Sequence, residues 1–128
     1  MILVDTSVWI AHLRKGASSL ASALEQGQVL MHPFVLGELA CGNLKNRRQV
    51  LRLLGDLPNA PQATNAEVMN FIERRALMGC GVGYIDAHLL ASVALAGTAR
   101  LWTLDKRLAA VAAELKLAYY SNSISKNA

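Results

Sequence analysis

The sequence lacks several features that would place it outside the ordinary globular classes. No apolar run approaches the roughly 18 residues that a membrane-spanning helix needs. The N-terminus has no basic region and passes straight into a strand-like pattern, so we expect no secretory signal. Only two cysteines are present, Cys41 and Cys80, and they are far apart, without metal-ligand spacing. We therefore expect a cytoplasmic protein that does not enter a membrane and has reduced, partly buried thiols.

The sequence also contains no internal repeat, no linker and no low-complexity segment. Its 128 residues are close to the commonest domain size, which predicts one domain with one core. The hydrophobic fraction of 53% and the charged fraction of 17% argue against disorder outside the tail. We expect a domain over residues 1–120 and a loose, polar tail over residues 121–128.

A mild excess of positive charge accompanies this composition. The net charge is +4, from 13 Lys and Arg against 9 Asp and Glu. The basic residues gather in one cluster (Lys45, Arg47, Arg48 and Arg52) and in the doublets Arg74-Arg75 and Lys106-Arg107. Each group has an ordinary explanation as a solvated helix face. A basic group beside an acidic site would be a better candidate for contacting phosphates.

Strand-like and helix-like patterns alternate along the chain. Strands are predicted at 2–5, 29–31, 100–103 and 118–120, with a further short edge strand near 59–61. Helices are predicted between them: 6–15, 18–26, 33–41, 46–54, 65–78, 84–96 and 106–115. This alternation predicts an α/β fold, a single domain with a central parallel sheet of about 4–5 strands and helices on both faces.

Four of the nine acidic residues lie in apolar surroundings. Asp5 ends the apolar run Ile2-Leu3-Val4, and Asp105 ends a similar run much later in the chain. Ligands of open α/β sheets bind beyond the carboxyl ends of the strands, so topology places both aspartates at one edge. Glu38 and Asp86 lie near the starts of two apolar helices, where the helix dipole favours an ionised acid.

Four carboxylates brought together would repel one another and would need a shared proton or a divalent cation. Oxygen ligands with open positions suit Mg²⁺ or Mn²⁺, and no His/Cys cluster suggests zinc. Such a site can activate water for phosphodiester hydrolysis. Thr103 lies two residues before Asp105 in an extended segment, so its hydroxyl faces the same side. Thr103 and Ser7 are therefore candidates to hydrogen-bond a carboxylate or a metal-bound water.

Simpler explanations exist for each of these residues. The three aspartates, Asp5, Asp86 and Asp105, can each act as a helix cap, and Glu38 can pair with an arginine. The three histidines are scattered, and we expect structural or surface roles for them: His12, His32 and His88. Trp9 and Trp102 are expected to pack in the core.

The order Asp5, Glu38, Asp86, Asp105, with the opening Ile-Leu-Val-Asp-Thr-Ser-Val-Trp-Ile, resembles PIN-domain ribonucleases. Within that family the chain is similar to the VapC-type toxins of bacterial toxin–antitoxin pairs. The matching pieces are Asp5-Thr6-Ser7, the helix with Glu38, the segment Gly83–Ala87 and Thr103-Leu104-Asp105, and the resemblance covers residues 1 to about 120. Each motif is short, but their order, spacing and total length together are specific.

The resemblance implies an endoribonuclease that uses Mg²⁺ or Mn²⁺ to cut single-stranded RNA, often a tRNA or rRNA loop, and so inhibits translation. It implies that Asp5, Glu38, Asp86 and Asp105 form the catalytic, metal-binding quartet, with Asp5 and Asp86 as direct ligands. Thr103 matches the hydroxyl residue that accompanies the last aspartate. The resemblance also implies a homodimer and a cognate antitoxin whose C-terminal segment blocks the active-site groove.

Two other readings fit part of the sequence. A phosphoryl-receiver signalling module has the same fold type and length. It would need a second acid after Asp5, a phosphoacceptor aspartate ending a middle strand and a lysine ending the last strand. Here Thr6 follows Asp5, Asp56 follows a basic helix pattern, and no lysine ends a strand near residue 119. A catalytically inactive PIN domain that serves as a binding module is the second reading, and the presence of all four acids argues against it.

Overall fold

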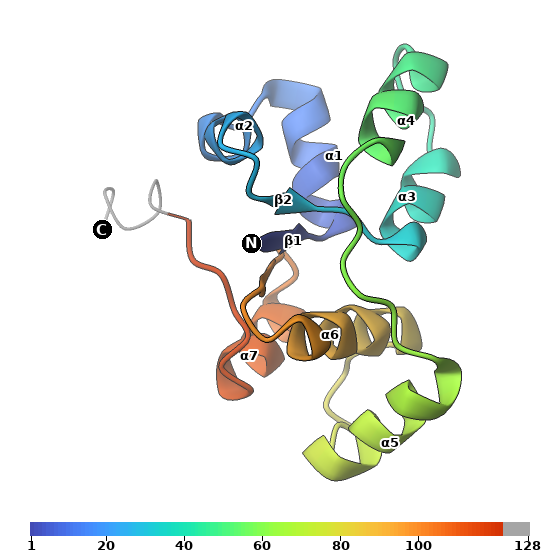
Figure 1. The fold of residues 1–128 in the computed structure, drawn as a ribbon, viewed down its shortest axis with the longest axis vertical. Coiled ribbons are helices and arrows are strands. Elements are labelled where there is room, and N and C mark those ends of the chain that lie inside the picture. Colours follow the sequence, from blue (N-terminus) through green and yellow to red (C-terminus); the bar gives the residue numbers. More distant parts are fainter. Residues whose placement is uncertain (122–128) are drawn as a thin grey trace.

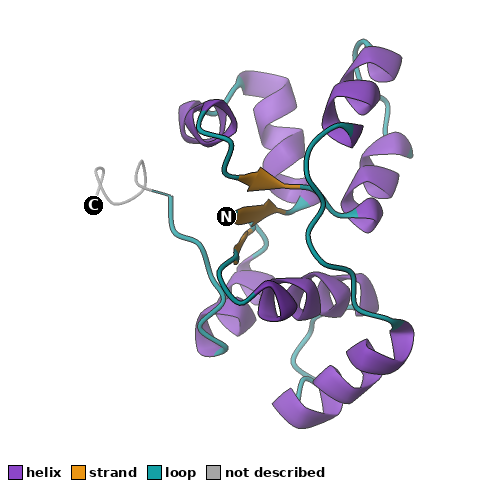
Figure 2. Ribbon diagram, viewed as in Figure 1, coloured by secondary structure: helices purple, strands orange, loops and turns teal. Residues whose placement is uncertain are grey.

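Three parallel strands form the centre of the fold. The structure is a computed structural model of the chain, and it describes residues 1–121. Strands β1 (Ile2–Val4), β2 (Val29–Leu30) and β3 (Arg100–Trp102) form a sheet with the order β2-β1-β3 (Figures 1 and 2). Leu3 of the central strand pairs with Leu30 on one side and Leu101 on the other. The first and last parts of the domain are therefore joined at β1.

Within residues 1–121, seven helices surround this sheet: α1 (Thr6–Lys15), α2 (Ser18–Glu25), α3 (Pro33–Ala40), α4 (Arg47–Gly55), α5 (Asn65–Arg75), α6 (Tyr84–Ala96) and α7 (Lys106–Glu114). In Figure 1, α1, α2 and α4 lie above the strands, α3 lies beside them, and α5–α7 lie below them. Successive residues of a strand point to opposite faces of a sheet. Because all three residues of β1 are buried, both faces of that strand are covered. The α/β class and the parallel sheet are confirmed.

The expected number of about 4–5 strands is wrong, because residues 1–121 contain three. The two further segments each contribute one isolated parallel bridge, Met31 with Asn59 and Leu101 with Ala118. Pro58 and Pro61 flank the first bridge and have no N–H to continue a ladder. At the other edge Leu101 exchanges two backbone bonds with Leu117 and Tyr119, and the pairing ends there.

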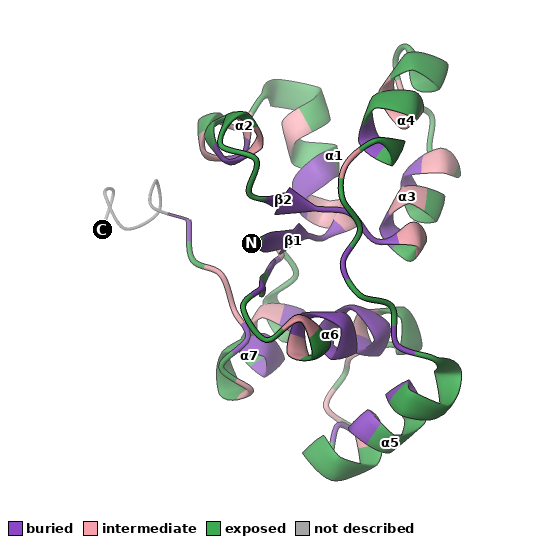
Figure 3. Cartoon of the chain, in the orientation of Figure 1, coloured by how far each residue is buried: buried purple, intermediate pink, exposed green. Residues whose placement is uncertain are grey.

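Helix α6 is the most deeply buried helix. Seven consecutive residues, 87–93, are buried, and Figure 3 shows this helix in the buried colour while α4 and α5 are largely exposed. A helix that is apolar on all sides belongs in the interior. Gly83 and Gly97 bound it, and Gly97 has a φ of 76°, which favours glycine. Trp9 and Trp102 pack in the core as expected, with 1% and 6% exposure.

Two smaller expectations are also corrected. The helix expected over 65–78 ends at Arg75, because Ala76 takes a left-handed φ of 53° and the Leu77 N–H turns back to the Ile72 carbonyl. Both cysteines are free as expected, but Cys41 is exposed rather than partly buried. Among residues 1–121 no helix is long and apolar enough to cross a membrane. The expected polar tail lies, apart from Ser121, outside the described residues.

Candidate active site

Asp5 lies where β1 ends and α1 begins. Its backbone N–H donates to the Trp102 carbonyl at 2.9 Å, which ties the ends of β1 and β3 together. Its side chain is 7% exposed and does not cap α1. The capping explanation is therefore wrong for the Asp5 carboxylate, and that buried acid has another role.

Two hydroxyl groups hold one oxygen of this carboxylate. Ser7 Oγ and Thr103 Oγ1 each donate to Asp5 Oδ2 at 2.8 Å. Within residues 1–121, Asp5 Oδ1 has no hydrogen-bond partner. The expectation that Ser7 and Thr103 bond a carboxylate is confirmed, and the carboxylate keeps one oxygen for a ligand.

The same hydroxyls fix the segment that leads to Asp105. Thr103 Oγ1 accepts from the Asp105 N–H at 3.0 Å, and Ser7 Oγ accepts from the Leu104 N–H at 3.0 Å. Asp105 is exposed and is the N-cap of α7, where its Oδ1 accepts from the Leu108 N–H at 3.0 Å. The capping explanation is confirmed for Asp105, whose carboxylate still borders the site.

Glu38 reaches the site from α3. Its Oε1 accepts from Thr6 Oγ1 at 2.8 Å, and no arginine of residues 1–121 pairs with it. The arginine explanation for Glu38 is wrong. The contact between Thr6 and Glu38 was not predicted from the sequence. The sequence signal for this contact is the hydroxyl group of Thr6, because the first turn after Asp5 faces the ends of the strands.

Asp86 is the third residue of α6, whose N-cap is Gly83, so Asp86 is not the N-cap; its Oδ2 accepts only a long hydrogen bond of 3.5 Å from the Gly83 N–H. Burial raises the pKa of Asp86, and the Gly83 N–H partly opposes that rise. The negative charges of Asp5, Asp105 and Glu38 raise this pKa further. The four acids are therefore close enough to act on one another electrostatically.

The side chains of the four acids are not arranged as a complete metal-binding site. No group of three or more metal-binding side chains in the described part of the chain is close enough to hold an ion as it stands. Mg²⁺, however, typically keeps several waters and binds through one or two carboxylates. The oxygen-only donor set, with Asp5 Oδ1 open and Asp86 nearby, fits such a hydrated ion.

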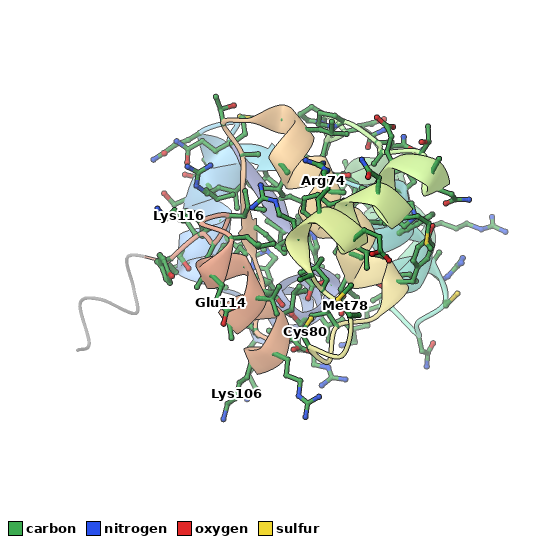
Figure 4. All side chains as sticks on the ribbon, turned by 90° about the horizontal axis from the view of Figure 1, so that it is seen from below. Arg74, Met78, Cys80, Lys106, Glu114 and Lys116 are labelled. Carbon is green, nitrogen blue, oxygen red and sulfur yellow. The ribbon has the colours of Figure 1, made fainter. Side chains whose placement is uncertain are left out.

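The basic residues do not neutralise these acids. No side chain of residues 1–121 forms an ion pair with any of the four. Lys106, next to Asp105, projects away from the body of the molecule (Figure 4). Arg47 of the expected basic cluster donates to the Ala40 carbonyl from Nε and Nη2, at 3.1 and 2.8 Å. Arg48 and Arg52 stay exposed on α4.

Two histidines link the helices that carry Glu38 and Asp86. His32 caps α3 by accepting the Phe34 N–H at Nδ1, 3.0 Å away, and its ring centroid lies 6.5 Å from that of His88 on α6. Burial, and secondarily the charge of His88, lower the pKa of His32 to about 4. Burial also lowers the pKa of His88. The structural role expected for both is confirmed.

Asp56 does not occupy the position that a phosphoryl-receiver module requires. It directly follows helix α4, whereas a phosphoacceptor aspartate follows a strand. The structure therefore gives no support to that alternative.

Comparisons with known proteins agree with this geometry. The family model described as PIN domain matches residues 2–114. The chain is 53% identical over 114 residues to "Ribonuclease VapC32" of Mycobacterium tuberculosis, in both strain CDC 1551 / Oshkosh and strain ATCC 25618 / H37Rv. The match covers 89% of this chain and 92% of each relative.

Proposed function

This chain belongs to the PIN-domain family, among its VapC-type members, and from that premise we propose that it is a metal-dependent endoribonuclease. The observation that carries the proposal is the Asp5 carboxylate, which is buried, has no ion-pair partner within residues 1–121 and is oriented by the Ser7 and Thr103 hydroxyls. Four acids that have no basic side chain to pair with need a bound cation to offset their mutual repulsion.

Asp5 and Asp86 would hold the ion, with Ser7 and Thr103 fixing the orientation of Asp5. When bound, Mg²⁺ or Mn²⁺ would supply a more acidic water and stabilise the charge on the leaving oxygen. Glu38, exposed and anchored by Thr6, would accept the proton of the attacking water. The water oxygen would then bond to phosphorus as the bond from phosphorus to the leaving ribose oxygen breaks, and that oxygen would take up a proton from solvent. Asp105 and Thr103 would hold the strand-end segment in place.

Cleavage of total RNA tests this assignment. We expect Mg²⁺ or Mn²⁺ to support cleavage, EDTA to abolish it, and Asp5→Asn and Asp86→Asn to reduce it by at least 100-fold. Glu73→Gln is the matched control, because Glu73 is exposed on α5 and has no side-chain hydrogen bond within residues 1–121. Equal cleavage by the wild type and both asparagine variants would overturn the site. It would also favour an inactive PIN domain with a contaminating nuclease.

We further propose that the protein is the toxin of a toxin–antitoxin pair and inhibits translation by cutting a tRNA or rRNA loop. Its partners would be that RNA, a second copy of the chain and an antitoxin whose C-terminal segment covers the acids. Sequencing the 5′ ends of RNAs after expression would identify the substrate. Cleavage confined to mRNA would contradict this part of the proposal while leaving the nuclease assignment intact.

A further inference from the structure

Two aromatic side chains stand exposed beside the acidic site. Phe34 is 38% exposed and Tyr84 is 44% exposed. Both rings lean on the buried ring of His88, each with its centroid 4.7 Å from that of the imidazole and at steep interplanar angles of 68° and 90°. A group of exposed rings, unlike apolar side chains scattered singly, is a candidate contact surface.

The two rings belong to the helices that carry two of the four acids. Phe34 lies one turn before Glu38 on α3, so the two side chains share a face of that helix. Tyr84 is the first residue of α6 and lies two residues before Asp86. Residues two apart on a helix do not share a face, so Tyr84 is linked to the acidic site through Phe34, because both rings pack on His88.

The rings are held in place by their surroundings. Tyr84 Oη donates to Asn65 Oδ1 at 3.1 Å, which links the ring to the start of α5. Phe34 packs edge-to-face on His32, with centroids 5.1 Å apart, and His32 is 2% exposed. His88, 3% exposed, supports both rings from within. Stacking on rings that are already ordered costs little further entropy.

We propose that Phe34 and Tyr84 form a stacking platform for an unpaired base of the RNA next to the bond that is cut. This inference rests on the proposed nuclease function. An unpaired base suits the platform because every base offers a π-face, and aromatic stacking is the usual way that proteins hold single strands. A stable protein interface needs about 800 Å² from each partner, and polar neighbours (Glu38, Asp86 and Asn65) interrupt the apolar surface here.

The platform makes the base, rather than only the phosphate, a determinant of cleavage. Phe34→Leu and Tyr84→Leu keep apolar bulk but remove the π-face, and Tyr84→Phe keeps the ring and removes only the hydroxyl. Leu95→Ala, at the far end of α6 and 51% exposed, is the control for loss of surface apolar area. Thermal unfolding of each variant checks that the fold is intact.

The experiment measures kcat/KM on a short single-stranded RNA that the wild type cuts, and on versions with an abasic nucleotide at each position flanking the cut. We expect the two leucine variants to lose about 5- to 150-fold on the intact RNA. Tyr84→Phe keeps the ring but loses its bond to Asn65, so it should lose less than the leucine variants, while Leu95→Ala should stay near wild type. One abasic position should cost the wild type a similar factor and cost the leucine variants nothing further.

Other results would overturn the inference. Equal losses by the leucine variants on intact and abasic RNA would mean that the rings only support the helices. Unchanged kcat/KM with a changed molar mass by light scattering would mean that the rings contact a second copy of the chain. If the wild type cuts no RNA, the proposed function fails. The absence of quenching of 2-aminopurine in added single-stranded RNA would then reject the platform as well.

Discussion

Asp5 is oriented by two hydroxyl groups that come from opposite ends of the sequence. Ser7 and Thr103 both donate to Oδ2, and Thr103 also accepts from the Asp105 N–H. Partners of this kind fix the direction in which a metal-binding carboxylate presents its free oxygen. Replacing the Thr103 hydroxyl group by a methyl group therefore disturbs two of the four acids, Asp5 and Asp105.

Thr103→Val should weaken Mn²⁺ binding by about 10- to 100-fold, because Asp5 loses a donor and the Asp105 N–H loses its acceptor. Isothermal titration calorimetry measures this directly. Thr98→Val, at an exposed position between α6 and β3, is the matched control and should bind Mn²⁺ as the wild type does. An unchanged affinity in Thr103→Val would show that these hydroxyls do not support the metal site.

His32 makes stability depend on pH. Its folded pKa is lowered to about 4, while the unfolded chain titrates near 6.5, so the unfolded state binds more protons between these values. Stability contributed by neutral His32 is present above pH 6.5 and is lost as the pH falls. We expect the free energy of unfolding to drop by about 2 kcal/mol from this residue between pH 7 and pH 5.

Urea unfolding at several pH values tests the role of His32. His32→Asn keeps an acceptor for the Phe34 N–H but cannot titrate, so its stability should fall less between pH 7 and pH 5 than that of the wild type. The same pH dependence in both proteins would assign the effect to other groups. Comparing the change with pH, rather than absolute stability, removes the packing cost of the substitution.

At the scale of elements, α3 carries Glu38 and is closed at both ends by side chains. His32 accepts the Phe34 N–H at its start, and Arg47 donates twice to the Ala40 carbonyl at its end. Carbonyls in the last turn of a helix have no partner within the helix, so Arg47 satisfies one of them. Arg47 thus joins α4 to α3 and is a poor candidate for contacting phosphates.

Arg47→Met should lower the free energy of unfolding by about 1 kcal/mol, because the Ala40 carbonyl then loses both donors. Arg48→Met removes the same charge one residue later, and it should change stability by less than about 0.5 kcal/mol. Urea unfolding of the two variants side by side isolates the two bonds from the charge. Equal stability of both variants would contradict the role given to Arg47.

The elements that the sequence predicted best are those with glycine or polar residues at their limits. Helix α6 was predicted over its observed span, because Gly83 and Gly97 enclose an unbroken apolar pattern. The end of α5 was missed, because nothing local marks Ala76 as left-handed. The edge bridges at Asn59 and Ala118 looked like strands, since apolar residues alone do not reveal how far a ladder continues.

Part of the candidate site could be predicted because some of its residues carry a local sequence signal. A carboxylate at the end of an apolar strand is a local signal, so Asp5, Thr103 and Asp105 could be placed at one edge by topology. Phe34 and Tyr84 carry no such signal, because an aromatic residue at a helix start usually packs inward. Their exposure follows only from the way that α3 and α6 meet at His88.

At the scale of the whole molecule, the fold brings four carboxylates together, and the repulsion among them lowers the stability of the metal-free protein. Asp86 is partly buried, and burial and three neighbouring carboxylates all disfavour its ionised form. Removing that charge should therefore stabilise the metal-free protein, even though it removes a proposed ligand. Functional sites commonly carry such a cost in stability.

Thermal unfolding with and without metal tests this balance. In EDTA, Asp86→Asn should have a higher Tm than the wild type. With Mn²⁺ at 100 times its Kd, the wild type should gain about 2.7 kcal/mol, which corresponds to a Tm rise on the order of 10 °C. Asp86→Asn should gain little, and Glu73→Gln should follow the wild type in both conditions.

A Tm that rises equally with Mn²⁺ in all three proteins would mean that the ion binds elsewhere. A lower Tm of Asp86→Asn in EDTA would mean that the hydrogen bond of Asp86 with the Gly83 N–H outweighs the repulsion among the four acids.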